Sequence, residues 1–422
     1  MQELQSMHEL IKHRGPDGEG IWTSQDFKVG MCHRRLSIID TSETGHQPMQ
    51  ALGGRFTITY NGEIYNYLEL RNELKDCFQF KTQSDTEVIL ASYKKWGEGC
   101  VEHFRGMFAF VIWDADTKTL FAARDRFGIK PFYFHDNESR FYFGSECKAI
   151  FPYLNDKKVD LEGLKDYLAF QFCQEGKTLF EGIRELQPGH KLRLNDKGLS
   201  IERYWEVHYV PDFLHTSNYF EERLRDLLED SVKYHLRSDV PVGAYVSGGL
   251  DSSAIASIAS DLEGENFLGF TGKFSFSKDY DESSYARLLC DNKGFKLHEI
   301  DITDQDFINS INKVIYHLDY PVAGPGSFPQ YMVSGLASKY RKVVLGGQGG
   351  DEIFGGYTRY LIAYFEQCIK AAIEGTDKSG NFIVTYESII PNLISLRNYK
   401  PMLTEFWKEG LFEDRDKRYF RL

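Results

Sequence analysis

The sequence has 422 residues and a formal net charge of −12 at pH 7. This length predicts two or three domains at about 150 residues each, and the 42% hydrophobic fraction excludes a disordered chain. The negative charge and the lack of Lys/Arg-dense stretches disfavour a nucleic-acid partner, and no apolar run reaches the roughly 18 residues of a membrane span. We therefore expect a globular protein that acts on a small molecule, with neither a nucleic-acid partner nor a membrane span.

The pattern of cysteines predicts that most of them are reduced, partly buried thiols. They are odd in number and scattered, with no Cys-x-x-Cys pair and no cluster with histidine that would predict a metal site. The opening residues lack the apolar core of a signal peptide, so we expect a cytoplasmic protein with reduced thiols. The seven cysteines are Cys32, Cys77, Cys100, Cys147, Cys173, Cys290 and Cys368.

The first half of the chain, residues 31–148, consists mainly of short β-type runs separated by turn signals. Residues 107–125 predict two strands around a turn at 114–117, and residues 132–146 repeat this arrangement. Apolar residues at helical spacing interrupt the strands at residues 66–75 and 86–96. This half therefore predicts an antiparallel sandwich with flanking helices.

Beyond a Gly- and Pro-bearing stretch at residues 182–198, apolar strands alternate with amphipathic helices. This alternation predicts βαβ units and a doubly wound parallel sheet, with sites at the carboxyl ends of its strands. We place the boundary near Arg203, which gives domains 1–203 and 204–422 in a chain that is α/β overall. The expected strands are 242–246, 267–274, 296–302 and 342–347, and the expected helices are 252–260, 282–293, 306–317 and 329–340.

The most specific feature follows the strand at 242–246, where the chain reads Ser-Gly-Gly-Leu-Asp-Ser-Ser and opens into a helix. Glycines let the backbone approach an oxyanion, serine hydroxyls donate to it, and the helix N-terminus adds amide N–H groups. The segment therefore predicts a phosphate-binding loop. Its members are Ser247, Gly248, Gly249, Asp251, Ser252 and Ser253.

This loop is not a Walker motif, because no Gly-Lys-Ser/Thr is present. It resembles the SGGxDS loop of the ATP-pyrophosphatase superfamily, whose members split ATP between the α- and β-phosphates. A carboxylate in a phosphate loop requires a cation, so we expect Asp251 to hold Mg²⁺ on the leaving pyrophosphate. A second Gly-rich segment, residues 346–356, follows another strand and makes Asp351 a second Mg²⁺ ligand candidate.

Together the two loops resemble the synthetase domain of glutamine-hydrolysing asparagine synthetases. The resemblance implies that Val246, Gly346 and Gly347 contact the AMP moiety of ATP, and that Gly272 reaches the adenosine. Gln348 departs from the family pattern, which often has a glutamate here that assists adenylate formation. An amide can orient a group by hydrogen bonds but cannot accept a proton as a carboxylate can, so we expect Gln348 to act by binding.

Five ordered motifs in the first half resemble the family's class II glutamine amidotransferase domain. The resemblance implies that Arg35 pairs with the α-carboxylate of glutamine, and that Asp85 and Glu63 pair with its α-ammonium. Asn61 and the N–H of Gly62 would form an oxyanion hole. Arg14, Arg124 and Arg126 are expected to be structural. The motifs are HRGPD (13–17), HRRLSIID (33–40), NGEIYN (61–66), SDTE (84–87) and RDRFG (124–128).

This amidotransferase class uses a cysteine that is the first residue of the mature chain. Its own α-amino group acts as the base. The chain as given starts Met1-Gln2, and only twelve residues precede the HRGPD segment. We therefore expect a glutaminase half that lacks its first strand and is inactive in this chain, and a synthetase half that lacks its C-terminal end.

The reaction implied is that of an asparagine synthetase, in which aspartate and ATP give β-aspartyl-AMP and pyrophosphate, and ammonia then gives asparagine. The expected small molecules are ATP, Mg²⁺, aspartate and glutamine or ammonia, and a homodimer is left open. Two alternatives remain: a relative that amidates another carboxylate, and a catalytically impaired module that binds glutamine. A tRNA-thiolating pyrophosphatase is disfavoured by the net charge of −12.

Overall fold

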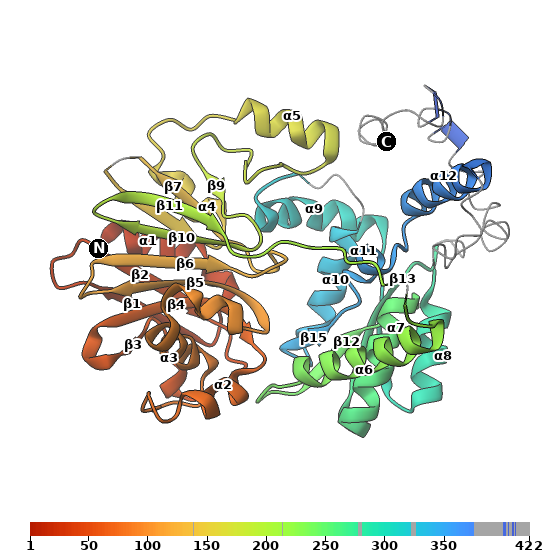
Figure 1. Cartoon of the computed structure of the whole chain (residues 1–422), viewed down its shortest axis with the longest axis horizontal. Helices are drawn as coiled ribbons and strands as arrows, with labels where there is room; N and C mark the ends of the chain where they lie inside the picture. The colour runs from red at the N-terminus through yellow and green to blue at the C-terminus, as the bar shows by residue number, and fades with distance from the viewer. Residues whose placement is uncertain are drawn as a thin grey trace.

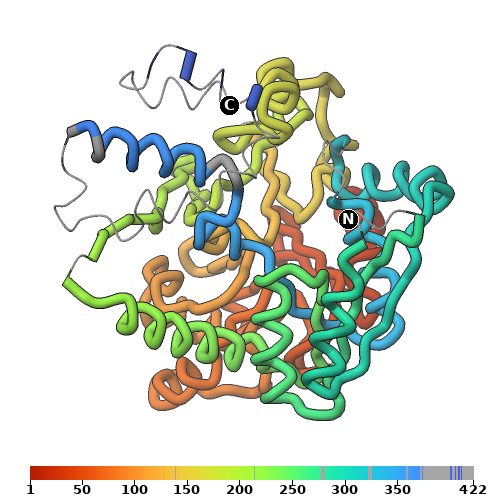
Figure 2. The backbone as a smooth tube through the Cα atoms, turned by 90° about the vertical axis from the view of Figure 1, so that its right-hand side faces the viewer, coloured from red at the N-terminus to blue at the C-terminus, as the bar shows by residue number. Residues whose placement is uncertain are grey.

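The structure is a computed structural model. It describes residues 1–374 except 138, 213, 277–280 and 322–325, and beyond them residues 400, 401, 404, 407, 408 and 410. The chain forms two halves, an antiparallel half that ends with β11 and a parallel half that starts with α6 (Figure 1). When the parallel half is turned toward the viewer, the antiparallel half lies behind it (Figure 2). No helix among the described residues is long and apolar enough to cross a membrane.

The antiparallel half is built on a six-stranded sheet with the order β11-β10-β6-β5-β4-β3. Two small sheets, β1-β2 and β8-β7-β9, cover one of its faces. The strands are β1 (Gly18–Thr23), β2 (Gly30–Arg35), β3 (Met49–Ala51), β4 (Phe56–Ile64), β5 (Gly106–Asp114), β6 (Thr119–Arg124), β7 (Tyr133–Asp136), β8 (Phe141–Gly144), β9 (Arg184–Glu185), β10 (His190–Asn195) and β11 (Gly198–Arg203).

Helices complete a four-layer αββα sandwich, in agreement with the antiparallel sandwich with flanking helices that the sequence predicts. Helices α2 and α3 pack on one face of the large sheet, and α1 and α4 pack outside the small sheets. These helices and α5 are α1 (Gln2–Leu10), α2 (Tyr67–Leu74), α3 (Asp85–Trp96), α4 (Cys147–Ile150) and α5 (Leu161–Phe170). The short 3₁₀ helices are η1 (Lys12–Arg14), η2 (Glu43–Gly45), η3 (Leu52–Gly54), η4 (Gly97–His103), η5 (Phe151–Tyr153) and η6 (Gly264–Asn266).

The continuous apolar sequence of strand β5 is explained by its position between two cores. Phe108 and Phe110 face the core under α2 and α3, whereas Ala109 and Val111 face the core between the sheets. Successive side chains of a strand point to opposite faces, and both faces of β5 are covered. A strand covered on both faces needs apolar residues at every position, not at alternate ones.

The parallel half has a four-stranded sheet with the order β14-β13-β12-β15 and all strands parallel. Helices α6, α7 and α8 cover one face, and α9 and α10 lie on the other, which is a doubly wound arrangement. The elements are α6 (Ser217–His235), β12 (Val242–Tyr245), α7 (Leu250–Glu263), β13 (Leu268–Lys273), α8 (Ser283–Lys293), β14 (Lys296–Asp301), α9 (Asp304–Leu318), α10 (Ser327–Ala337), β15 (Val343–Leu345), α11 (Gly350–Phe354) and α12 (Thr358–Glu374).

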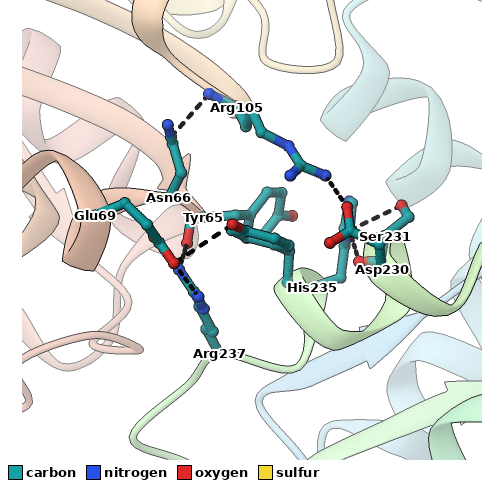
Figure 3. Close-up of polar contacts among 9 residues, drawn as sticks. Tyr65, Asn66, Glu69, Arg105, Asp230, Ser231, His235 and Arg237 are labelled. Atoms are coloured by element: carbon teal, nitrogen blue, oxygen red, sulfur yellow. Dashed lines mark hydrogen bonds and ion pairs between the residues drawn. The ribbon is translucent and has the colours of Figure 1, made fainter. Parts of the chain in front are cut away.

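Polar and aromatic contacts join the two halves (Figure 3). Arg105 forms an ion pair of 2.6 Å with Asp230 on α6, and the rings of Tyr65 and His235 lie 4.1 Å apart. Arg237 donates to the carbonyl oxygen of Tyr65 at 2.7 Å. The end of α6 is therefore held against the end of β4.

The strands and helices expected from the sequence are present, with ends that shift by a few residues. The 19-residue helix α6 is absent from the expectation, although apolar residues at 220, 224, 227, 228 and 232 carry a helical spacing. All seven cysteines are free, whereas the sequence predicts reduced thiols for most of them. Arg124 donates to the carbonyl oxygens of Gly128, Lys130 and Leu186, which is a structural arrangement.

Candidate functional site

The phosphate-loop segment lies between the end of β12 and the start of α7. The hydroxyls of Ser247 and Ser252 are 2.9 Å apart, and the Ser252 hydroxyl donates to the carbonyl oxygen of Gly249 at 3.1 Å. Gly248 has a φ of 96°, a left-handed conformation that favours glycine. The loop thus places serine hydroxyls and the N-terminal amides of a 14-residue helix at the carboxyl end of a central strand.

The second Gly-rich segment packs directly on this loop. A Cβ atom on Gly347 would lie 2.6 Å from the backbone nitrogen of Ser252, and one on Gly350 would lie 2.3 Å from Oδ2 of Asp251. Real Cβ contacts are longer than this, so both positions need glycine for this packing. The loops after β12 and β15, which are neighbours in the sheet, therefore form one site.

The carboxylates of Asp251 and Asp351 are suited to a divalent cation. Across the described residues, neither side chain takes part in a hydrogen bond or an ion pair. Within the same residues, no group of three or more His, Cys, Asp or Glu side chains could hold a metal ion alone. Mg²⁺ commonly takes one or two carboxylates and completes its shell with phosphate and water, so the residues present fit it.

The other nucleotide-site candidates occupy different environments. Val246 is fully buried and its N–H donates to the carbonyl oxygen of Phe270, so only its backbone borders the loop. A Cβ on Gly272 would lie 2.7 Å from the side chain of Ile302, which is a packing reason for this glycine. Gln348 is exposed beside Gly346, and its amide donates to Gln330 on α10 at 3.5 Å.

A second site lies in the antiparallel half, where a cavity of about 930 Å³ opens between β2, β4 and β8. Its walls include residues from four of the five predicted motifs, which are far apart in sequence. The cavity is within the range of roughly 300–1,000 Å³ that small-molecule sites occupy. The predicted residues that line it are Arg35, Asn61, Gly62, Glu63 and Asp85.

Arg35 is fixed by the loop that follows it. Its guanidinium donates to the carbonyl oxygens of Ser42 at 2.9 Å, Ile39 at 3.3 Å and Asp40. These carbonyls carry no formal charge, so the guanidinium charge stays available to an anion in the cavity.

Asn61 and Gly62 are arranged to donate into the cavity. Nδ2 of Asn61 is buried and has no hydrogen-bond partner among the described residues, which is a costly state for an amide donor. Gly62 has a φ of 156°, and a Cβ there would lie 2.1 Å from the carbonyl oxygen of Met107. A free amide next to a glycine backbone is the arrangement that an oxyanion needs.

Glu63 and Asp85 place two buried carboxyl groups on one wall of this cavity. Burial, together with the nearby Asp85 carboxylate, raises the pKa of Glu63 to about 8. Burial also raises the pKa of Asp85, although the N–H of Ile64 and the hydroxyl of Tyr60 donate to it at 3.0 and 2.9 Å. A ligand cation placed between these two carboxyl groups would favour their ionised forms, so this wall is suited to a cation although Glu63 holds a proton at neutral pH without one.

Three residues of this cavity are absent from the sequence-based prediction. Tyr60 donates to Asp85, and Gln47 accepts from the N–H of Tyr60 at 2.7 Å. Lys130 lines the cavity, and burial lowers its pKa. No motif marks Gln47 or Lys130, because tertiary packing alone brings them to the site; Tyr60 directly precedes the motif at Asn61.

Comparison with known proteins finds a matching family for each half of the chain. A family described as "Glutamine amidotransferase domain" matches residues 1–205, and one described as "Asparagine synthase" matches residues 223–421. The chain is 38% identical over 359 residues to asparagine synthetase (glutamine-hydrolyzing) 1 of Bacillus subtilis, which covers 85% of this chain and 56% of that protein.

Two further relatives differ in their names. A Methanocaldococcus jannaschii protein with the provisional name asparagine synthetase (glutamine-hydrolyzing) 2 is 36% identical over 386 residues, which covers 86% of this chain and 74% of that protein. Amidase chry2 of Gibberella zeae is 32% identical over 379 residues, with 85% and 56% covered. The chain thus spans about half the length of the Bacillus and Gibberella relatives.

Proposed function

Because the chain belongs to the family of glutamine-hydrolysing asparagine synthetases, we propose that its parallel half activates aspartate with ATP. The products of this step are β-aspartyl-AMP and pyrophosphate, and ammonia then displaces AMP to give asparagine. We propose further that the antiparallel half binds glutamine as the source of this ammonia. The domains would be residues 1–203 and 204–422, a division that the end of β11 at Arg203 and the two family matches support.

The packing of the two loops after β12 and β15 carries the first proposal. Ser247 and the amides at the start of α7 donate to the phosphates of ATP, and the partial positive charge of the helix terminus stabilises the same anion. Asp251 and Asp351 would hold Mg²⁺, which supplies charge neutralisation on the leaving pyrophosphate. The backbones of Val246, Gly346 and Gly347 border the loop where the AMP moiety would lie.

The unpartnered amide of Asn61 carries the second proposal. A glutamine that lies with its α-carboxylate on Arg35 and its α-ammonium near Glu63 and Asp85 meets a cation at one end and, at the other, two carboxyl groups whose ionised forms its ammonium favours. The Nδ2 of Asn61 and the N–H of Gly62 would then donate to the side-chain carbonyl of glutamine, where negative charge develops during hydrolysis.

A second candidate function is amidation of a different carboxylate by the same activation step. Two observations favour it: Gln348 stands where the family pattern often has a glutamate, and a relative at 32% identity is named an amidase. Gln348 can orient a carboxylate or a water through its amide, but it cannot take a proton at neutral pH.

The test is ATP–pyrophosphate exchange measured with a panel of carboxylic acids. We expect exchange that depends on aspartate and Mg²⁺, and loss of exchange in Asp251→Asn, because an amide is a poor ligand for this hard cation. The matched control is Asp261→Asn, an exposed residue further along α7 that forms an ion pair with Lys293. Exchange with another acid and none with aspartate would select the second candidate, and near-normal exchange in Asp251→Asn would contradict the proposed Mg²⁺ site.

A further inference from the structure

The position of the Arg35 guanidinium depends on residues 36–42, the Arg35 loop. Three backbone carbonyls of this loop accept from the guanidinium, so a shift of the loop moves the charge. Within the loop, the Asp40 carboxylate accepts from the Ser42 hydroxyl at 2.5 Å, and it also accepts from the N–H of Gln83 at 2.9 Å. Hydrogen bonds thus order this loop. The residues that form these bonds therefore help to set the position of the Arg35 guanidinium in the cavity.

One of these bonds comes from the parallel half. Oδ2 of Asp239 accepts from the N–H of Asp40 at 2.7 Å, and the N–H of Asp239 donates to the carbonyl oxygen of Ile38 at 3.0 Å. Asp40 is buried, whereas Asp239 is exposed. Asp239 therefore holds the Arg35 loop at two points from outside the antiparallel half.

A second bond reaches the same loop from Lys342. Its ammonium forms an ion pair of 2.8 Å with Asp17, and the same carboxylate oxygen of Asp17 accepts from the N–H of Ser37 at 2.8 Å. The N–H of Asp17 also donates to the carbonyl oxygen of Arg35 at 2.9 Å. The Lys342–Asp17 pair thus fixes the backbone on the other side of Arg35.

Asp239 and Lys342 occupy related places in the parallel sheet. Asp239 lies just before β12, and Lys342 lies just before β15, which pairs with β12 in register. The carboxyl ends of these two strands carry the nucleotide loops at Ser247 and Gly346. The amino ends of the same strands therefore hold the Arg35 loop, across a strand of four residues, or about 13 Å.

The residues that follow β4, the strand that carries Asn61, have a contact to the same segment. Arg237 donates to the carbonyl oxygen of Tyr65 and to both carboxylate oxygens of Glu69 at 2.6 Å (Figure 3). Tyr65 directly follows Ile64, whose N–H donates to Asp85. Residues 237–239 thus contact both the loop that holds Arg35 and the residues just after the strand that carries Asn61.

We infer that Asp239 and Lys342 are positioning residues for the glutamine site, supplied by the nucleotide-binding half to set the place of the Arg35 guanidinium. This inference rests on the proposed function of that cavity. It assigns to the synthetase half a part in glutamine binding that does not require contact with glutamine. Asp239 is the stronger of the two, because its partner Asp40 is buried, whereas the Lys342–Asp17 pair is partly exposed.

The test measures the dissociation constant for glutamine by calorimetry in the whole 422-residue chain. Asp239→Ala should raise this constant about five- to tenfold, as expected for the loss of one hydrogen bond that orders a charged group. Asp239→Asn keeps an oxygen acceptor and should stay within about twofold of the parent. Asp230→Ala, which removes an ion pair between the halves away from the Arg35 loop, is the matched control and should leave the constant unchanged.

Kinetics separate positioning from a general structural effect. In Asp239→Ala, the dissociation constant for glutamine should rise, while kcat and KM for ammonium in the ATP-dependent reaction remain those of the parent. If Asp239→Asn bound glutamine as weakly as Asp239→Ala, the cause would be the lost negative charge of Asp239, which acts on Glu63, and not the lost hydrogen bond. That result would overturn the inference. A parent that does not bind glutamine, or an Arg35→Ala variant that binds as well as the parent, would instead overturn the proposed glutamine site. A weakened Arg35→Ala with an unchanged Asp239→Ala would refute the inference alone.

Discussion

Replacement of Glu63 by glutamine tests the electrostatics of the cavity through the stability of the protein. The Glu63 side chain is buried next to the Asp85 carboxylate, and burial followed by that charge raises its pKa from 4.5 to about 8. Glutamine has nearly the same shape, and it carries no charge at any pH in this range. The variant therefore removes the need to bind a proton on folding.

The direction of the change in stability with pH follows from the pKa of Glu63 in the folded and unfolded states. Between pH 4.5 and about pH 8 the folded protein holds a proton on Glu63 that the unfolded chain releases, so this group lowers stability as pH rises. The penalty grows by about 1.4 kcal/mol per pH unit in this window, to about 3 kcal/mol at pH 7 and about 5 kcal/mol above pH 8. Below pH 4.5 both states are protonated and the group contributes nothing.

The assay is denaturant unfolding of the parent and of Glu63→Gln at several pH values. The free energy of unfolding of the variant, less that of the parent, should increase from pH 5 to pH 8 and level off above it. Any constant difference in packing between the two side chains cancels from this slope. The exposed Glu102→Gln is the control and should give a flat difference. A flat difference for Glu63→Gln as well would refute the reasoning that burial sets the charge of this wall.

Three further predictions address the other half and the core. Gly350→Ala should reduce ATP–pyrophosphate exchange by at least about tenfold, because its Cβ would lie 2.3 Å from Oδ2 of Asp251 and displace that Mg²⁺ ligand. Gln348→Ala should lower the single-turnover rate of adenylate formation, and Gln348→Glu should change it, because the amide binds but does not take a proton. Phe108→Ala should lower the free energy of unfolding by about 3–5 kcal/mol in denaturant titration, because Phe108 is fully buried beneath α2 and α3.

For each of these three predictions, a stated result would contradict the reasoning, and the glycine and phenylalanine variants each have a matched control. Gly335→Ala introduces a Cβ with no atom within 4 Å and should keep normal exchange, so equal losses at both glycines would contradict the packing argument. If both Gln348 variants formed the adenylate at the rate of the parent, Gln348 would have no role in this step. Phe27, which is 77% exposed, should tolerate alanine within about 0.5 kcal/mol, and a similarly small loss at Phe108 would contradict the core assignment.

Local patterns in the sequence were sufficient for much of the fold. The apolar run of β5 and the segment from Ser247 into α7 are each continuous in the chain, so spacing and residue type define them before any tertiary contact forms. The alternation of strands and helices also predicts the parallel sheet, because a βαβ connection needs a crossover helix. The same logic could have found α6, whose apolar residues recur at helical spacing.

The chemistry of both sites, in contrast, depends on groups that are distant in the chain. Gly350 lies against Asp251 only because β12 and β15 are neighbours in the sheet, and Asp239 holds the Arg35 loop only because the two halves pack together. The raised pKa of Glu63 depends on burial and on Asp85, which another element supplies. Residue type and local spacing carry no information about such burial or pairing, because desolvation and charge interactions are set by everything that surrounds a group. The sequence by itself therefore determined the elements and the candidate residues, and the tertiary structure decided their partners, their charge states and the link between the two sites.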